Sequence, residues 1–204
     1  PELLTSPTET SERFSAENEE LALYRHYLEE VSRQKDHVLS LKEEQLLARM
    51  GEISQAPSTI FGMINDADIE FPHVIDEQGR RVQLTKERYR QLIESPDRRV
   101  RREAFEAMHR TYKKQENTLA ATLQASVKKD VFYARTRKYE SAREAALDAD
   151  NIPLSVYDNL LKSVHDHTHL FHRYVNLRKR MLGLNEIHMY DLYTPMVPDM
   201  NVKV

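Results

Sequence analysis

The stretch that decides the fold runs from Ser95 to Tyr139 and reads SPDRRVRREAFEAMHRTYKKQENTLAATLQASVKKDVFYARTRKY. It opens on a serine and a proline, which suit the N-cap and the first position of a helix, and no glycine or proline follows Pro96. Its apolar residues keep near-helical spacing, at Val100, Ala104, Met108, Leu119, Leu123, Val127, Val131 and Ala134. The stretch therefore predicts one helix of roughly 40 residues, about 60 Å long at 1.5 Å per residue.

Helical patterns continue on the N-terminal side of this stretch. Apolar residues recur at helical spacing over residues 14–31, and Ser40 with Glu43 three residues later forms the capping-box pattern that starts a second helix. Gly51 is placed to end that helix, and Pro57 opens a shorter one. Residues 1–13 are polar, and we expect them to be frayed.

The C-terminal side shows the same character. Residues 141–149 predict a short helix, and residues 157–182 predict a long amphipathic helix that Gly183 is placed to end. The tail from residue 188 to 204 contains three valines and two prolines, so we expect an extended chain there.

One segment has the pattern of strands. Alternating apolar residues flank the turn sequence Asp76-Glu77-Gln78-Gly79, and Thr85 can cap a short helix through Ile93. The predicted fold is mainly α, with long antiparallel helices and one small β-hairpin near residues 69–84. The predicted organisation is a frayed segment over 1–13, a helical domain over 14–85 and a further region over 86–204.

Composition excludes several classes of protein. Hydrophobic residues make up 40% and charged residues 31% of the 204, which is typical of a folded chain that is long enough to bury a core. The absence of cysteine excludes disulfides and thiolate chemistry and fits a reducing, cytoplasmic compartment. No apolar run approaches the roughly 18–20 residues that cross a bilayer, so no membrane partner is expected. The chain starts at a proline and stops at Val204, so we expect it to be part of something longer.

Charge is unevenly spread along the chain. Residues 1–56 hold 12 acidic and six basic residues, whereas residues 86–143 hold eight acidic and 16 basic residues. The densest basic run, residues 98–102, could bind nucleic acid, but its arginines scatter around the helix and Asp97, Glu103 and Glu106 are close enough to pair with them. We therefore favour an ion-paired, solvated helix face and expect no nucleic-acid partner.

Four histidines crowd the predicted helix over 157–182. His165, His169 and His172 share one face, and a histidine pair at i and i+4 can hold zinc. No glutamate follows His165 in the position that a metalloprotease needs, so the favoured interpretation is a polar flank beside an apolar stripe. These three histidines are kept only as adventitious metal candidates. Phosphate-binding glycine loops and nucleophile elbows are also absent from the sequence, which therefore predicts no catalytic or cofactor-binding residue.

Four stretches together resemble the oligoendopeptidase F family, which is related to the thimet oligopeptidases. They are His37-Val38-Leu39-Ser40-Leu41-Lys42-Glu43-Glu44-Gln45-Leu46-Leu47, Lys138-Tyr139-Glu140-Ser141-Ala142-Arg143-Glu144-Ala145-Ala146, Asp150-Asn151-Ile152-Pro153 with Val156-Tyr157-Asp158, and Met189-Tyr190-Asp191-Leu192-Tyr193-Thr194-Pro195. The resemblance covers roughly residues 20–200.

The resemblance implies a zinc metallopeptidase that cleaves short, unfolded peptides. In that family an H-E-x-x-H helix supplies two zinc ligands and the general base. None of the nine histidines here is followed by glutamate, so these roles cannot be carried over to this chain. The chain would then be an inactive N-terminal part whose helices wall the substrate channel, with residues 86–204 beginning the catalytic region. It would expose apolar patches that allow self-association. The alternative is a non-enzymatic helical module that docks a protein or nucleic acid through residues 86–143.

Overall fold

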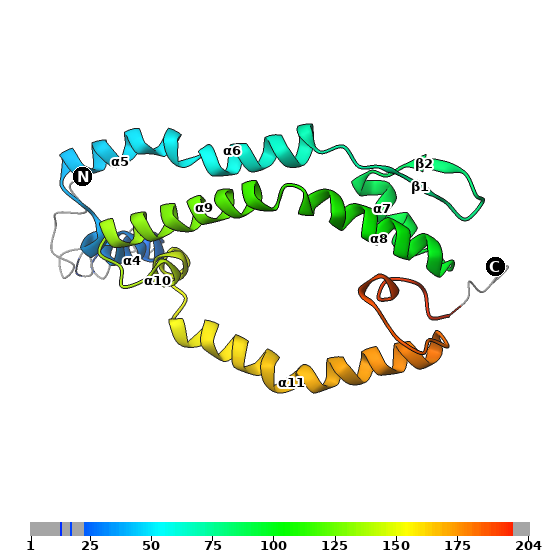
Figure 1. Ribbon diagram of the computed structural model, residues 1–204. Helices are drawn as coiled ribbons and strands as arrows, with labels where there is room; N and C mark the ends of the chain where they lie inside the picture. The colour runs from blue at the N-terminus through cyan, green and yellow to red at the C-terminus, as the bar shows by residue number, and fades with distance from the viewer. Residues whose placement is uncertain (1–12, 14–16, 18–22, 198–204) are drawn as a thin grey trace. The chain divides into compact units, whose positions relative to one another are not determined.

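The computed structural model describes residues 13, 17 and 23–197 (Figure 1). Apart from Arg13, the predicted frayed segment lies outside the described residues, as do Phe14, Leu21 and the last seven residues of the tail. The helices are α4 (Arg25–Arg33), α5 (Leu41–Ser54), α6 (Ala56–Met63), α7 (Lys86–Ile93), α8 (Arg98–Lys113), α9 (Glu116–Thr136), α10 (Ala142–Asp148) and α11 (Leu154–Met181). Shorter turns are η1 (Gln34–His37), the π-helical η2 (Ile64–Asp68) and η3 (Met189–Asp191).

The only sheet in this described part of the chain is the predicted hairpin. Strand β1 (His73–Ile75) pairs antiparallel with β2 (Arg81–Gln83), with Val74 opposite Val82. Gly79 closes the turn with a φ of 76°, a left-handed conformation that glycine adopts without steric cost. A mainly α fold with one small hairpin is thereby confirmed.

The chain divides into two compact units. The first unit contains residues 1–56 and 125–154, and the second contains residues 57–124 and 155–204. In the second unit, β1, α7 and α8 enclose a hydrophobic core formed by Phe71, Val74, Leu84, Leu92, Val100, Ala104, Ala107 and Met108. Figure 1 shows the hairpin beside α7 and α8, as this core requires.

Three helices begin at residues whose side chains cap the helix N-terminus. Ser40 caps α5 and forms the complete capping box with Glu43. Thr85 caps α7 by accepting from the N–H of Arg88, and Ser141 caps α10 by accepting from the N–H of Glu144. In each case the side-chain oxygen satisfies an N–H group that has no partner within the helix.

The predicted 40-residue helix is wrong in two respects. Asp97, rather than Ser95, is the N-cap, and Arg98 is the first helical residue. The helix also breaks after Lys113 and restarts at Glu116, because the Gln115 N–H bonds to the Tyr112 carbonyl instead of continuing the α-helical ladder. Residues 113–117 contain no apolar side chain, so packing does not hold that turn in regular α geometry.

Gly51 and the C-terminal tail also depart from prediction. Gly51 lies inside α5, which continues to Ser54. Glycine disfavours a helix interior by only about 1 kcal/mol, so a single glycine does not have to end the helix. The tail is not extended over residues 189–191, where the 3-10 turn η3 forms. This turn folds because the buried Asp191 draws the chain back toward α8, as described below.

Three helices end on residues in the left-handed conformation. Gly183 after α11 has a φ of 64°, Lys138 after α9 has 63° and Asn151 after α10 has 54°. At Gly183 the next N–H reaches back to the Lys179 carbonyl, the bond that closes a Schellman cap. The prediction that Gly183 ends the long helix is confirmed.

The two glycine environments predict opposite effects of the same substitution. Gly183→Ala should lower the free energy of unfolding by roughly 1 kcal/mol, because alanine is strained at positive φ although its Cβ would meet no atom within 4 Å. Gly51→Ala should raise it by about 0.5–1 kcal/mol, because Gly51 is inside a helix with free space around it. Urea unfolding followed by circular dichroism measures both, and equal signs would contradict the assigned conformations.

Candidate functional site

A network of hydrogen bonds and ion pairs surrounds Asp191, which is fully buried, with 0% of its surface exposed. From α8, Arg98 donates to both carboxylate oxygens, with Nε 3.1 Å from Oδ1 and Nη2 3.0 Å from Oδ2. Arg101 Nη2 donates to Oδ1 at 2.8 Å, and the His188 N–H donates to Oδ2 at 2.9 Å. One carboxylate therefore ties η3 to two arginines that precede it by about 90 residues. We call Asp191, Arg98 and Arg101 the Asp191 clasp.

Two further contacts extend the Asp191 clasp. Arg178, 4% exposed near the end of α11, donates from Nε to the Asp191 carbonyl at 2.9 Å and also donates to the Thr194 carbonyl. The Thr194 hydroxyl donates to the Ser95 carbonyl at 3.2 Å, and Arg101 donates to the same carbonyl. Within the second unit, α8, α11 and the chain after α11 thus share one hydrogen-bond network.

The electrostatic state of Asp191 follows from this geometry. Burial opposes ionisation, but the hydrogen bonds from Arg98, Arg101 and the His188 N–H outweigh it and hold the pKa of the Asp191 carboxyl below its usual value. Asp191 is therefore an anion between two guanidinium groups, and the site is built for structural fixation rather than proton transfer.

The remaining arginines of α8 are also paired with acidic groups. Arg102 donates to Glu106 at 2.8 Å, and Arg99 lies 3.3 Å from both Asp97 and Glu103. The ion-paired interpretation of the basic run is confirmed for these arginines. It was wrong in calling the whole run solvated, because Arg101 is only 3% exposed.

A second polar cluster lies in the first unit and joins two of the family-like stretches. Arg137 forms a two-pronged ion pair with Glu44, both N···O distances being 2.9 Å, and lowers the pKa of that carboxyl. His37 donates from Nδ1 to the Arg137 carbonyl at 2.8 Å and stacks on Tyr139 with ring centroids 3.6 Å apart.

Tyr139 connects this cluster to α4 and α10. Its hydroxyl donates to Asp148 at 2.7 Å, and Arg33 Nε lies 3.2 Å from the other Asp148 oxygen. Burial and the bond to Asp148 raise the pKa of Tyr139 to about 12, so its hydroxyl remains a donor at neutral pH.

The three candidate histidines of α11, His165, His169 and His172, are all exposed. Across residues 13, 17 and 23–197, no group of three or more His, Asp or Glu side chains is arranged to hold a metal ion.

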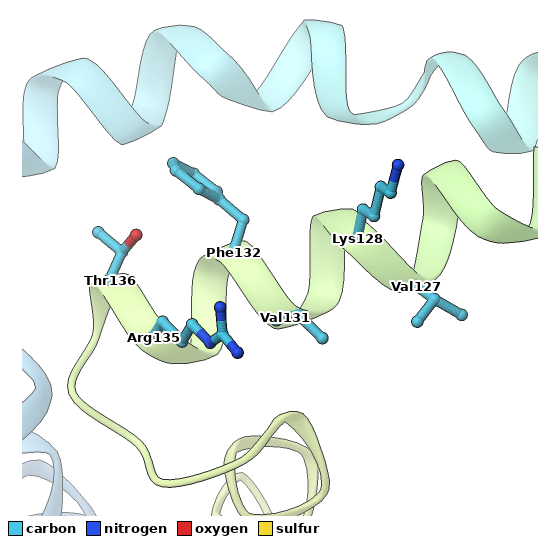
Figure 2. A pocket seen from close by; sticks show the side chains of 6 residues that line it. All are labelled: Val127, Lys128, Val131, Phe132, Arg135 and Thr136. Carbon is cyan, nitrogen blue, oxygen red and sulfur yellow. The ribbon is translucent and has the colours of Figure 1, made fainter.

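A shallow apolar hollow lies along one side of α9 in the first unit. Figure 2 shows its lining side chains, which all come from this one helix: Val127, Lys128, Val131, Phe132, Arg135 and Thr136. It contains no carboxylate or histidine, so it offers no acid–base chemistry.

Sequence reasoning missed the Asp191 clasp because its members are far apart along the chain. The sequence did contain a signal: Asp191 lies in the Tyr190-Asp191-Leu192-Tyr193 stretch that resembles a family motif, and the arginine run is its partner.

None of the described helices is both long enough and apolar enough to cross a membrane.

Comparisons with known proteins place these features in a family context. A family model described as Oligopeptidase F matches residues 2–71, and one described as Peptidase family M3 matches residues 91–203. The chain is 48% identical to Oligopeptidase PepF of Bacillus subtilis over 204 residues, which are all of this chain and 30% of that protein. It is 44% identical to Group B oligopeptidase PepB of Streptococcus agalactiae, over 96% of this chain and 33% of that protein.

A solved structure has the same fold. The crystal structure of oligoendopeptidase-F from Enterococcus faecium superposes with a TM-score of 0.91 at 44% identity, covering 99% of this chain and 39% of that one. The chain therefore spans about a third of the length of the curated relatives that it matches.

The Asp191 clasp predicts a large and pH-dependent effect of one substitution. At pH 7, Asp191→Asn should lower the free energy of unfolding by roughly 3–5 kcal/mol, because Arg101 is left buried without a carboxylate. The folded-state pKa of Asp191 lies below its unfolded value, so this stabilisation is complete above about pH 5 and is lost as pH falls through the folded pKa.

Urea titrations at pH 7 and pH 3 measure the difference between Asp191→Asn and the wild type, which should shrink at the lower pH. The matched control is Glu106→Gln on the exposed side of α8, which should cost less than about 1 kcal/mol. Equal effects of the two substitutions on the free energy of unfolding at pH 7 would show that the buried Asp191 stabilises the fold no more than an exposed ion pair does.

Proposed function

The chain belongs to peptidase family M3, and we propose from this membership that it forms part of a zinc-dependent metalloendopeptidase that hydrolyses short peptides. The observation that carries the proposal is the match of the family M3 model to residues 91–203, together with 48% identity to Oligopeptidase PepF of Bacillus subtilis over the whole chain. The printed names of the relatives describe oligopeptidases, which favours peptides as the substrate class.

We propose that the zinc ligands and the general base belong to the part of the family protein outside these 204 residues. The residues that the structure describes do not fit a zinc site, since no three candidate ligands converge among them and no histidine of the sequence is followed by glutamate. We accordingly assign no catalytic role to His165, His169 or His172, and no chemical step to this chain.

The contribution that we propose for this chain is architectural: its helices form a wall of the substrate channel and exclude folded proteins. Long helices fastened by buried ion pairs, such as Arg101 with Asp191, suit a wall that must keep its shape. We also propose the division into a helical domain over 14–85 and the beginning of the catalytic region over 86–204, which the two family-model matches support. A cytoplasmic location belongs to the same proposal and is supported by the absence of cysteine.

The competing function, docking of nucleic acid by the basic helices, has less support. Arg98, Arg99, Arg101 and Arg102 each donate to a carboxylate of the same chain. Phosphate binding would have to displace these partners before it neutralised any backbone charge.

The peptidase proposal predicts activity only in a full-length chain. We expect a chimera, in which these 204 residues replace the matching residues of Bacillus subtilis PepF, to cleave an internally quenched short peptide and to lose that activity with chelator and regain it with zinc. The 204-residue chain alone should cleave nothing. A folded chimera without activity, or chelator-sensitive cleavage by the chain alone, would contradict the proposal.

The paired state of the α8 arginines predicts no retention of DNA or RNA by this chain in filter binding at low salt. Retention that disappears as salt is raised would instead favour the nucleic-acid module. Arg102→Gln removes an exposed arginine of the run; it should leave the absence of retention unchanged, whereas it would weaken retention if this helix bound phosphates.

A further inference from the structure

The first five turns of α11 carry large apolar side chains on one face of the helix. Leu160, Leu161, Val164 and Phe171 recur at intervals of three, four and seven residues, so they share one face of the helix. All four are exposed, and Val164 and Phe171 retain 63% and 60% of their accessible surface. We call these four residues the α11 apolar face. Large apolar side chains that gather exposed on one face often mark a site of contact with another protein surface.

The opposite side of α11 is polar. Lys162 pairs with Asp166 at i and i+4, and His169 and Arg173 fall on the same side by helical spacing. This opposite side therefore suits water, whereas the α11 apolar face suits burial. His165 and His172 lie at the border between the two sides.

Within the second unit, Arg178 fastens α11 near its C-terminal end. Arg178 is buried and bonds to the chain at Asp191 and Thr194, whereas residues 154–167 are exposed throughout. The bonds from Arg178 thus hold the C-terminal part of α11 to the chain around the Asp191 clasp, while the side chains of the α11 apolar face are exposed. A helix held in this way is preorganised to receive a second surface.

The relatives indicate what that surface is. The Enterococcus faecium structure contains this fold over 99% of the present chain, but the matched region is only 39% of that chain. The Bacillus subtilis relative likewise has 70% of its length outside the match, since the match is 30% of that protein. In such proteins the remaining residues are held close to α11 by the same polypeptide, which gives them a high effective concentration compared with a second molecule.

We propose that the α11 apolar face is an internal docking surface for the part of a family M3 chain that lies outside these 204 residues. The occupant is an apolar surface of that remaining part, and α11 is the element that joins it to the Asp191 clasp. The proposal rests on family membership and on exposure, not on peptide cleavage.

Cysteine accessibility tests this docking, because the 204 residues contain no cysteine and an introduced thiol is therefore unique among them. We compare Val164→Cys and Phe171→Cys with the matched control Arg173→Cys, which lies on the polar side of the same helix. Each is made in the 204-residue chain and in the full-length Bacillus subtilis chimera. The rate of maleimide labelling is read at the introduced position by mass mapping, so thiols elsewhere in the chimera do not interfere.

In the 204-residue chain all three thiols should label rapidly. In the chimera, Val164→Cys and Phe171→Cys should label more slowly by at least about tenfold, whereas Arg173→Cys should be unchanged. Rapid labelling of all three in the chimera would overturn the proposal, as would protection that appears only when a substrate peptide is added, because the face would then line the channel. Protection in the 204-residue chain that grows with its concentration would also overturn it, in favour of a second copy.

The labelling rates test the docking proposal independently of the proposed peptidase activity. A chimera that protects Val164→Cys and Phe171→Cys but cleaves no peptide would support docking and contradict the function. A chimera that cleaves peptides with both thiols fully reactive would do the reverse.

Discussion

The ion pairs between Asp191 and the two arginines of α8 are the constraint on which the second unit depends. A carboxylate with no exposed surface is costly unless its charge and both oxygens are satisfied, and here Arg98, Arg101 and the His188 N–H satisfy them. Because these donors come from separate parts of the chain, ionised Asp191 is compatible with one arrangement of η3 against α8. The buried pair thereby favours one geometry of η3 against α8.

The first unit uses the same physical device with different residues. Glu44 and Arg137 form a two-pronged pair, and Tyr139 stacks on His37 while it donates to Asp148. Three of the four stretches that resemble the family therefore have a structural reason for their residues: two meet in this cluster, and the stretch around Asp191 forms the other. Such residues hold helices in place, which is consistent with a region that shapes a protein without supplying its chemistry.

The elements that could be predicted from sequence are those specified by neighbouring residues. The capping box of Ser40 and Glu43, the N-caps at Thr85 and Ser141 and the C-terminal cap at Gly183 each need only a few consecutive residues. The Asp191 clasp could not be predicted in the same way, because Asp191 is separated from Arg101 by 90 positions and no periodicity links them. The turn η3 was missed for the same reason, since the clasp draws a segment with an extended pattern into a 3-10 turn.

The break between α8 and α9 shows how a local pattern can mislead. Apolar residues keep helical spacing on both sides of Lys114 and Gln115, and no glycine or proline lies between, yet the helix ends and restarts there. Helical periodicity reports which faces can be buried, whereas most helical stability in a protein comes from packing, and residues 113–117 have no apolar side chain to pack. The same distinction applies to α11, whose apolar pattern predicts a buried face although residues 154–167 remain exposed in the described chain. The proposed docking reconciles a pattern that predicts burial with a structure that shows exposure, because other residues of the family protein would then complete the packing.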